Sequence, residues 1–302
     1  MGTLEKINKT SMKVIDGKAM AEEIRNELKK EVEILKKEGN KVPHLAAVLV
    51  GNNPASETYV NAKVKACAEV GFGSSLIKLP ETITENELLE KVKEINNNPE
   101  IDGYIVQLPL PSHINEQKIT LAISPKKDVD GFHPENLGRM VLNLPCFLPA
   151  TPAGMVEMLR RSNIDTTGKH CVVVGRSHIV GSPISILMAR NSNPGNCTVT
   201  ITHSRTKNLE EYTKNADILM VAIGKPEFIT AKHVKEGAVV IDVGIHRIED
   251  ASKKSGFRLV GDVKYDEVAP KCSYISPVPG GVGPMTIATL MSNTLSAVKI
   301  KF

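Results

Sequence analysis

The chain alternates short apolar runs with longer segments of helical periodicity, and this alternation occurs twice. In the first 110 residues the apolar runs include 45–50 and 103–106, and segments with apolar residues at helical spacing flank them. The same rhythm restarts at 171–174 and continues through three further apolar runs to residue 242. Alternating strands and helices are typical of parallel sheets. We therefore expect an α/β protein with two α/β domains, which a length of 302 residues allows.

The Pro-bounded segment 148–152 is the best domain boundary. We place an N-terminal domain at 1–150 and a second domain at 151–284. Residues 277–284 are too rich in Pro and Gly for a helix or a strand. After them, 285–302 is expected to contain a helix that packs back on the first domain. Residues 1–13 are expected to be a disordered or strand-leading extension.

A helix over residues 54–70 carries the first candidate pair. Pro54 marks its first turn and Gly71 ends it. Tyr59 and Lys63 are four residues apart, so they project from one face. A partly desolvated lysine can move protons, which makes the pair a candidate for catalysis. The alternative is a surface lysine whose stem packs over the tyrosine ring.

Composition excludes several classes of protein. The net charge of +4 is spread along the chain, which argues against a nucleic-acid partner but allows an anionic ligand. No run reaches the length of a membrane span, and no signal peptide begins the chain. The five cysteines are widely separated without metal-ligand spacing, so we expect no metal and a reduced, cytoplasmic protein.

A glycine loop at residues 175–183 joins a strand to a helix, where backbone N–H groups can hold a pyrophosphate. Ser177 stands where the usual pattern has a second glycine, so the alternative is a tight turn that binds nothing. After the next strand come Ser204 and Arg205, with no acidic residue nearby. Together with Arg176 this favours NADP over NAD, although Arg205 fits a solvated loop equally well.

Residues 127–132 place Asp128 and Asp130 two apart before a glycine. In an extended segment both point to one side, and one carboxylate could orient a substrate ring. A pair of turn-forming aspartates is the alternative. The histidines are scattered, and nothing marks any of them as a general base.

These stretches together resemble the bifunctional methylenetetrahydrofolate dehydrogenase/methenyltetrahydrofolate cyclohydrolase family, often called FolD. The match runs in order from about residue 13 to 302. The segments that carry it are 56–63, 107–111, 127–131, 151–154, 175–183 and 279–286.

The resemblance implies that a tetrahydrofolate derivative lies in a cleft between the domains, next to the nicotinamide. Lys63 would be the central catalytic residue, with Gln107 hydrogen-bonded nearby. Tyr59 would stack on the folate, and Asp130 would anchor the pterin. Further folate contacts are expected from Leu108, Pro279, Gly280, Gly283 and Pro284.

The expected NADP contacts come from the loops that follow the strands of the second domain. They are Gly175, Arg176, Ser177, Val180, Gly181, Pro183, Ser204, Arg205, Ala222, Ile223, Gly224 and Ile245. A homodimer is implied as well, and so is a role in the one-carbon metabolism that supplies purine biosynthesis.

The implied chemistry needs no general base for hydride loss, because the product is a cation. Water addition needs proton movement, for which Lys63 is the candidate. Two alternatives remain: a dehydrogenase with weak or absent cyclohydrolase activity, and a non-catalytic dinucleotide sensor.

Overall fold

The computed structural model describes residues 12–253 and 256–299, which form two compact units. The first unit contains residues 18–154 and 284–299, and the second contains 12–17 and 155–283. The divisions fall four residues after the predicted boundary at 150 and one residue before the predicted boundary at 284. The prediction for residues 1–11 lies outside the described residues.

The first unit is built on a three-stranded parallel sheet in the order β3, β2, β4. The strands are β2 (His44–Val50), β3 (Gly73–Leu79) and β4 (Gly103–Val106). The helices are α1 (Gly17–Lys37), α2 (Pro54–Val70), α3 (Glu85–Asn97), α4 (Glu116–Ala122), α5 (Pro134–Val141) and α10 (Val282–Lys299).

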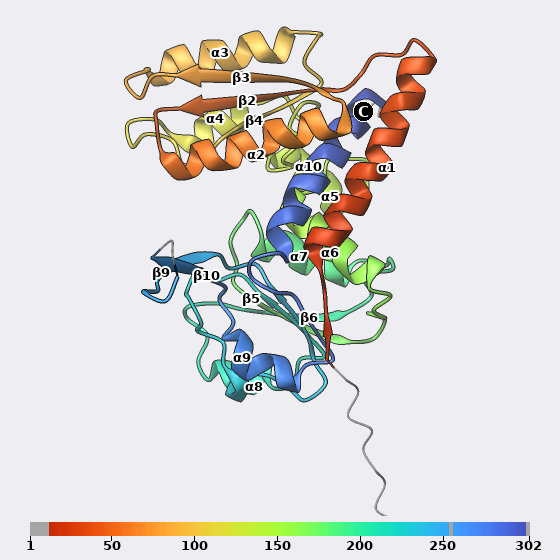
Figure 1. Ribbon diagram of the computed structural model, residues 1–302, viewed down its shortest axis with the longest axis vertical. Helices are drawn as coiled ribbons and strands as arrows, with labels where there is room; N and C mark the ends of the chain where they lie inside the picture. Colours follow the sequence, from red (N-terminus) through yellow and green to blue (C-terminus); the bar gives the residue numbers. More distant parts are fainter. Residues whose placement is uncertain (1–11, 254–255, 300–302) are drawn as a thin grey trace, which may run out of the picture. The chain divides into compact units, whose positions relative to one another are not determined.

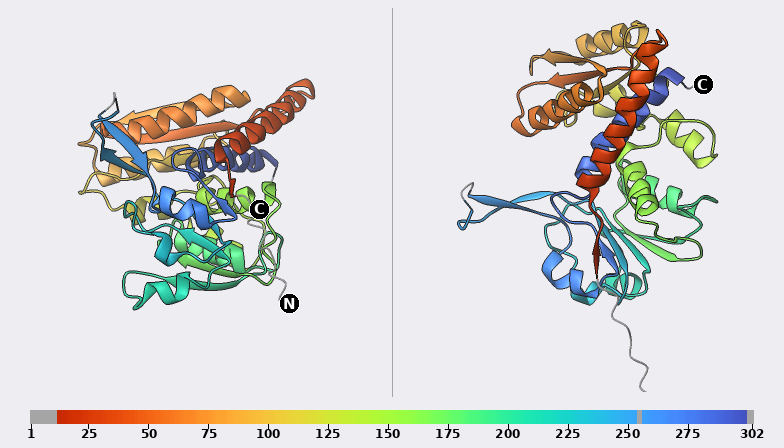
Figure 2. Two further views of the ribbon diagram at one scale, coloured as in Figure 1. Left: turned by 60° about the horizontal axis from the view of Figure 1, so that its bottom comes forward. Right: turned by 45° about the vertical axis from the view of Figure 1, so that its right-hand side comes forward.

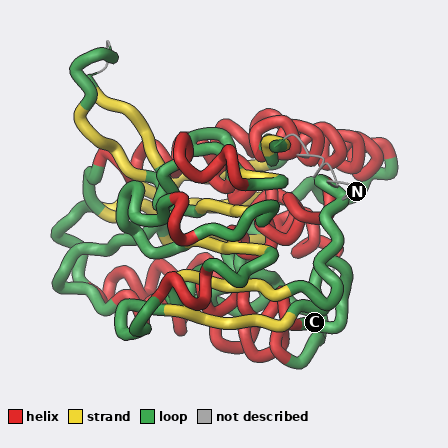
Figure 3. Tube along the Cα trace, turned by 90° about the horizontal axis from the view of Figure 1, so that it is seen from below, coloured by secondary structure: helices red, strands yellow, loops and turns green. Residues whose placement is uncertain are grey.

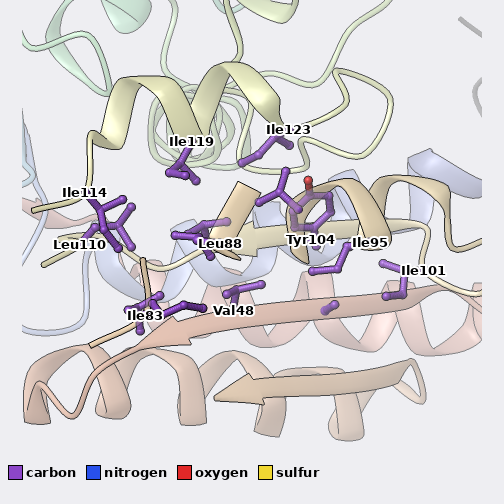
Figure 4. Packing of buried hydrophobic residues seen from close by; sticks show 14 residues of the cluster. Val48, Ile83, Leu88, Ile95, Ile101, Tyr104, Leu110, Ile114, Ile119 and Ile123 are labelled. Atoms are coloured by element: carbon purple, nitrogen blue, oxygen red, sulfur yellow. The ribbon is translucent and has the colours of Figure 1, made fainter. Parts of the chain in front are cut away.

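Alternation along β2 divides the core of this unit between the two faces of the sheet. Val48 packs with Tyr104 of β4, Leu88 of α3 and Ile119 of α4 in one buried cluster (Figure 4). The helix α2 lies along β2 and β3 (Figure 1). Since α3 and α4 cover the Val48 face, α2 covers the other one. The helix α3 begins with a capping box, in which Thr84 and Glu87 bond reciprocally.

Several side-chain contacts join α10 to the rest of the first unit, including a hydrogen bond between Thr286 and Thr151 and an ion pair between Lys299 and Glu31. Asn293 Nδ2 donates to the carbonyl oxygens of Val129 (2.8 Å) and Leu148 (2.9 Å). Met291 Sδ lies 3.7 Å from Cys67 Sγ of α2. These contacts agree with the predicted return of the C-terminal helix.

The helix α10 begins at Val282, within the Pro-Gly segment predicted to be irregular. That prediction was wrong for residues 282–284. Pro284 fits there because the N–H groups of the first helical turn have no intrahelical acceptor.

The second unit has a six-stranded, entirely parallel sheet in the order β1, β11, β8, β7, β5, β6. The strands are β1 (Lys13–Val14), β5 (His170–Val174), β6 (Thr198–Thr202), β7 (Ile218–Val221), β8 (Val239–Asp242) and β11 (Tyr274–Ile275). The helices are α6 (Ala150–Arg161, which begins in the first unit), α7 (Gly181–Ala189), α8 (Leu209–Thr213), α9 (Tyr265–Val268) and the 3-10 turns η1 (Ala231–His233) and η2 (Ala269–Lys271).

The strand order contains one topological switch point. The chain passes from β5 outward to β6 and then returns to the other side of β5 as β7. Ligands of open α/β sheets bind outside the carboxyl ends of the strands at such a point. The loops after β5 and β7 are therefore the expected walls of a dinucleotide site.

Two features of the second unit escape the sequence prediction. β9 (His246–Glu249) and β10 (Phe257–Val260) form an antiparallel ribbon that stands apart from the main sheet (Figures 2 and 3). β1, placed in the N-terminal domain by the sequence, pairs instead with β11 of the second unit. Each of β1 and β11 has only two residues, which is too short for an alternating pattern to be recognised in the sequence. Across the described ranges, no helix combines the length and apolarity that crossing a bilayer requires.

Candidate active site

The helix α2 holds Lys63 at its middle. The side chain of Asn53 accepts from the backbone N–H of Ser56 (3.2 Å), which satisfies one donor of the first turn. At the other end Gly71 has φ +83°, the left-handed conformation that stops a helix. Tyr59 and Lys63 are thereby fixed one turn apart.

Gln107, at the carboxyl end of β4, is the hydrogen-bond partner of Lys63. Lys63 Nζ donates to Gln107 Oε1 at 3.2 Å. Gln107 Nε2 donates to the carbonyl oxygen of Leu108 at 2.7 Å. Because the amide N–H₂ is committed to Leu108, the amide oxygen faces the lysine. The sequence prediction that these two residues meet is confirmed.

The residues around Lys63 differ in their exposure to solvent. The side chain of Tyr59 is 48% exposed, so its ring is available for stacking. Within the described residues, neither a hydrogen bond of its hydroxyl nor a cation–π contact with Lys63 is found. Cys67, one turn after Lys63, is buried, and burial raises the pKa of its thiol to about 12. A thiolate nucleophile beside Lys63 is therefore excluded.

The two aspartates of the 127–132 segment have different environments. Asp128 is buried, and its Oδ2 accepts from His133 N (2.7 Å) and Asn136 Nδ2 (3.0 Å). Burial outweighs these bonds and raises the pKa of Asp128 to about 6. Asp130 is half-buried, and both aspartates line a small pocket together with Leu108 and Phe132. The Asp128 carboxylate thus holds the segment through its hydrogen bonds, whereas among the described residues the Asp130 carboxylate has none.

In the second unit, two glycines of the loop at 175–183 pack closely against neighbouring backbone. Gly175 has φ +125°, and a Cβ there would lie 2.2 Å from the carbonyl oxygen of Ala222. A Cβ on Gly181 would lie 2.3 Å from the carbonyl oxygen of Gly175. Ser177 Oγ accepts from the N–H groups of Val180 and Gly181, both at 3.2 Å. The serine at the second glycine position thus stabilises the start of α7.

A closed turn follows β6. His203 N donates to Thr206 Oγ1 (2.9 Å), and Arg205 N donates to His203 Nδ1 (3.1 Å). The turn leaves the side chains of Ser204 and Arg205 exposed, as is that of Arg176 in the glycine loop. Two cations and a hydroxyl without a nearby carboxylate fit a ribose that carries a 2′-phosphate.

Other predicted positions lie on the remaining loops of the second unit. Ala222, Ile223 and Gly224 follow β7 at the switch point, and Ile245 follows β8 with its side chain 48% exposed. Gly280 has φ +103°, and a Cβ on Gly281 would lie 2.5 Å from the carbonyl oxygen of Pro277. The positive φ at Gly280 and the close backbone packing at Gly281 thus require glycine at these two positions.

Three polar residues of this unit lie near the loops expected to bind the cofactor and were not singled out from the sequence. Asp242, Asp262 and His246 form a hydrogen-bonded cluster behind the loops after β7 and β8. Burial raises the pKa of Asp242 to about 7, against the lowering effect of three backbone N–H donors. The sequence signal was an aspartate within two residues of a glycine at the end of a strand, in 242–244 and 261–263, which also fits an ordinary turn.

Comparison with known families places both halves of the chain. Residues 15–130 match the family model described as "Tetrahydrofolate dehydrogenase/cyclohydrolase, catalytic domain". Residues 149–302 match the model described as "Tetrahydrofolate dehydrogenase/cyclohydrolase, NAD(P)-binding domain".

Relatives match over nearly the full chain. A protein of Cytophaga hutchinsonii named "Bifunctional protein FolD" is 72% identical over 290 residues, covering 96% of this chain and 100% of the relative. A protein of the same name from Flavobacterium johnsoniae is 62% identical, covering 96% and 98%.

Solved structures agree with these relatives. The bifunctional FolD enzyme of Campylobacter jejuni superposes with a TM-score of 0.90 at 46% identity, over 96% of this chain and 99% of that one. The Trypanosoma brucei enzyme, solved with NADP cofactor and an inhibitor, gives 0.89 at 38% identity, over 95% and 97%. The chain therefore belongs to the tetrahydrofolate dehydrogenase/cyclohydrolase family.

Proposed function

We propose that this chain oxidises 5,10-methylenetetrahydrofolate with NADP and hydrolyses the resulting 5,10-methenyltetrahydrofolate to 10-formyltetrahydrofolate. The observation that best supports this proposal is the hydrogen bond between Lys63 and Gln107, in a chain whose full-length relatives are named bifunctional. The pair supplies a positioned amine for water addition, and the second unit supplies loops of the kind that hold a dinucleotide.

The atoms and charges balance over two steps. A hydride leaves the one-carbon bridge, and a nitrogen lone pair stabilises the methenyl cation that remains. NADP, when bound, supplies the hydride acceptor. Water then adds to the methenyl carbon, and cleavage of one carbon–nitrogen bond opens the ring. Of the two protons of the water, one ends on the departing nitrogen and the other goes to solvent.

Lys63 is the proposed proton carrier of the second step. Gln107 Oε1 accepts a hydrogen bond from Nζ and so directs the nitrogen. Tyr59 offers an exposed ring against which the folate can stack. Asp130 is the proposed acceptor for the N–H groups of the pterin, with Leu108 beside it in the same small pocket.

The second unit is the proposed NADP-binding part. Ser204, Arg205 and Arg176 are the proposed partners of the 2′-phosphate, and the loop at 175–183 those of the pyrophosphate. The segment Pro279, Gly280, Gly283 and Pro284 is proposed to contact the folate. Hydride transfer itself requires that the folate and the nicotinamide touch.

A spectrophotometric assay tests the assignment. The chain is mixed with 5,10-methylenetetrahydrofolate and either NADP or NAD, and reduced nicotinamide and methenyl product are followed together. We expect reduction with NADP and little methenyl build-up. Build-up in the unaltered chain would support the alternative of a dehydrogenase with weak cyclohydrolase activity. Absence of any reduction with either cofactor would support the non-catalytic sensor.

We further propose that two copies of the chain pair through β6. Within the described residues β6 pairs with β5 alone, which leaves its outer edge open, and Ile201 on it is 44% exposed. An open edge with an apolar side chain favours a second strand. Light scattering is expected to give the mass of a dimer, and that of a monomer for Ile201→Lys. A monomeric mass for the unaltered chain would contradict the pairing.

The proposed location is the cytoplasm. All five cysteines lie within the described residues and are free thiols, four of them buried. Unpaired cysteines are typical of reducing compartments.

A further inference from the structure

The carboxylate of Asp262 is fully buried and receives four hydrogen bonds. Its Oδ2 accepts from the backbone N–H groups of Ile223 (2.8 Å) and Gly224 (3.0 Å). Its Oδ1 accepts from the backbone N–H of Lys225 (2.8 Å) and from His246 Nε2 (2.7 Å). A carboxylate has about four lone-pair positions, so all of them are filled. Since a carboxylate only accepts, His246 must carry its proton on Nε2.

The three backbone donors are consecutive, and they directly follow β7. Successive N–H groups that converge on one point form an anion-binding nest. Here the protein's own carboxylate fills the nest, so these N–H groups are not free for a phosphate. The loop 223–225 can contact a dinucleotide only through its other atoms.

This loop lies at the topological switch point of the sheet. The residue before it, Ala222, has its carbonyl oxygen so close to Gly175 that a Cβ there would lie 2.2 Å away. The loops after β5 and β7 therefore touch. Whatever fixes the conformation of 223–225 also fixes one wall of the dinucleotide site.

A second buried carboxylate holds Asp262 in place. Asp242 Oδ1 accepts from the N–H groups of Asp262 (3.0 Å) and Gly244 (2.9 Å), and its Oδ2 accepts from Val263 N (2.9 Å). A Cβ on Gly261 would lie 1.8 Å from Asp242 Oδ2. The two carboxylates thus join the loop after β7, the turn after β8 and the end of the β9–β10 ribbon.

We propose that Asp262 is a positioning residue of the cofactor site, which fixes the loop 223–225 for NADP without touching NADP itself. The proposal rests on the proposed function of the second unit. His246 acts through Asp262, since its Nε2 completes the hydrogen bonds of the carboxylate and ties the β9 strand to it.

The test compares two reactions of the same full-length chain. Hydrolysis of supplied methenyltetrahydrofolate needs no NADP, whereas oxidation of methylenetetrahydrofolate does. Asp262→Asn turns one acceptor into a donor that faces backbone N–H groups. It is expected to raise the KM for NADP by about tenfold or more. The hydrolysis rate is expected to stay within about twofold, because hydrolysis uses no NADP and Lys63 belongs to the other unit. An unchanged KM for NADP in folded Asp262→Asn would overturn the proposal.

Two substitutions of His246 disturb the hydrogen bonds of Asp262 less than Asp262→Asn does. His246→Ala removes one of the four donors and is expected to raise the KM for NADP, while His246→Gln can donate again and is expected to restore it. If Asp262→Asn does not fold, equal KM values in these two variants would overturn the proposal. If the unaltered chain fails to reduce NADP, the proposed function is wrong. If the unaltered chain reduces NADP and the variants have the same KM for NADP, Asp262 does not position the cofactor site.

Discussion

At the scale of single residues, Asp128 and Asp130 show how the same residue type two positions apart acquires different roles. Asp128 accepts hydrogen bonds from His133 and Asn136, whereas the half-buried Asp130 carboxylate has no hydrogen bond among the described residues. The spacing indicated that one carboxylate would be available for a ligand. It did not indicate which, because that depends on where His133 and Asn136 place their donors.

Asp130→Ala is expected to raise the KM for methylenetetrahydrofolate by about tenfold, since a charged acceptor for the pterin would be lost. The KM for NADP serves as the internal control and should change little. Steady-state kinetics with each substrate varied in turn measure both constants. An unchanged folate KM would contradict the anchoring role.

Asp128 gives a pH-dependent contribution to stability. Its pKa in the folded chain is raised to about 6 by burial, above the ordinary value of 3.8. The folded state therefore holds a proton that the unfolded state has lost, and the stabilisation disappears as pH rises from about 4 to about 6.

The size of this effect is at most about 3 kcal/mol. Asp128→Asn keeps an acceptor oxygen for His133 and Asn136, so the variant should fold and lack this slope. Urea unfolding at several pH values measures the difference between the two proteins. Parallel stability curves would show that Asp128 does not titrate in this range.

Arg205→Ala is expected to raise the KM for NADP by about tenfold and to leave the KM for NAD nearly unchanged, because only NADP carries the 2′-phosphate. Substitution of Arg190 serves as the control, because Arg190 lies at the end of α7 that is farther from the glycine loop. A similar rise in both cofactor constants for Arg205→Ala would argue for a general loss of structure.

At the scale of elements, local signals explain most of what the sequence predicts. The capping box at Thr84, Pro54 in the first turn of α2 and Gly71 after its end are chemical markers of helix boundaries. The strands β5, β7 and β8 are continuous apolar runs, as buried parallel strands are. The ribbon of β9 and β10 was not predicted because each strand has only four residues and most of them are not buried.

The junction of β5 and α7 depends on a close backbone approach. Gly181→Ala would place a Cβ 2.3 Å from the carbonyl oxygen of Gly175, which cannot rotate away. We expect this substitution to lower the free energy of unfolding by about 3 kcal/mol and to raise the KM for NADP.

Gly138, inside the helix α5, is the matched control for Gly181. A Cβ there meets nothing within 4 Å, so Gly138→Ala should stabilise the chain by about 0.5–1 kcal/mol. Urea unfolding of both variants provides the comparison. Equal stabilities would show that the loop relaxes to accept a Cβ.

At the scale of the whole molecule, the chain consists of two units with separate sheets. The alternation of strands and helices predicted both sheets as parallel. It could not predict that residues 13–14 add a strand to the second sheet, because a two-residue strand is fixed by its partner β11 and not by its own pattern. In the same way, the buried pair Asp242 and Asp262 is 20 residues apart in sequence and becomes visible only when the sheet brings the loops together.

We propose that Lys63 serves water addition, while hydride transfer depends chiefly on how the ligands are held. Lys63→Met keeps an unbranched side chain of similar length and removes the amine. Binding of folate and NADP to this variant is expected to remain largely intact, and titration of each ligand provides that control.

The most direct measurement is the rate at which Lys63→Met hydrolyses supplied 5,10-methenyltetrahydrofolate, followed as loss of the methenyl absorbance. We expect enzymatic hydrolysis to be abolished, with methenyl product accumulating when the variant is given methylenetetrahydrofolate and NADP. Hydrolysis by Lys63→Met at the rate of the unaltered chain would contradict the account.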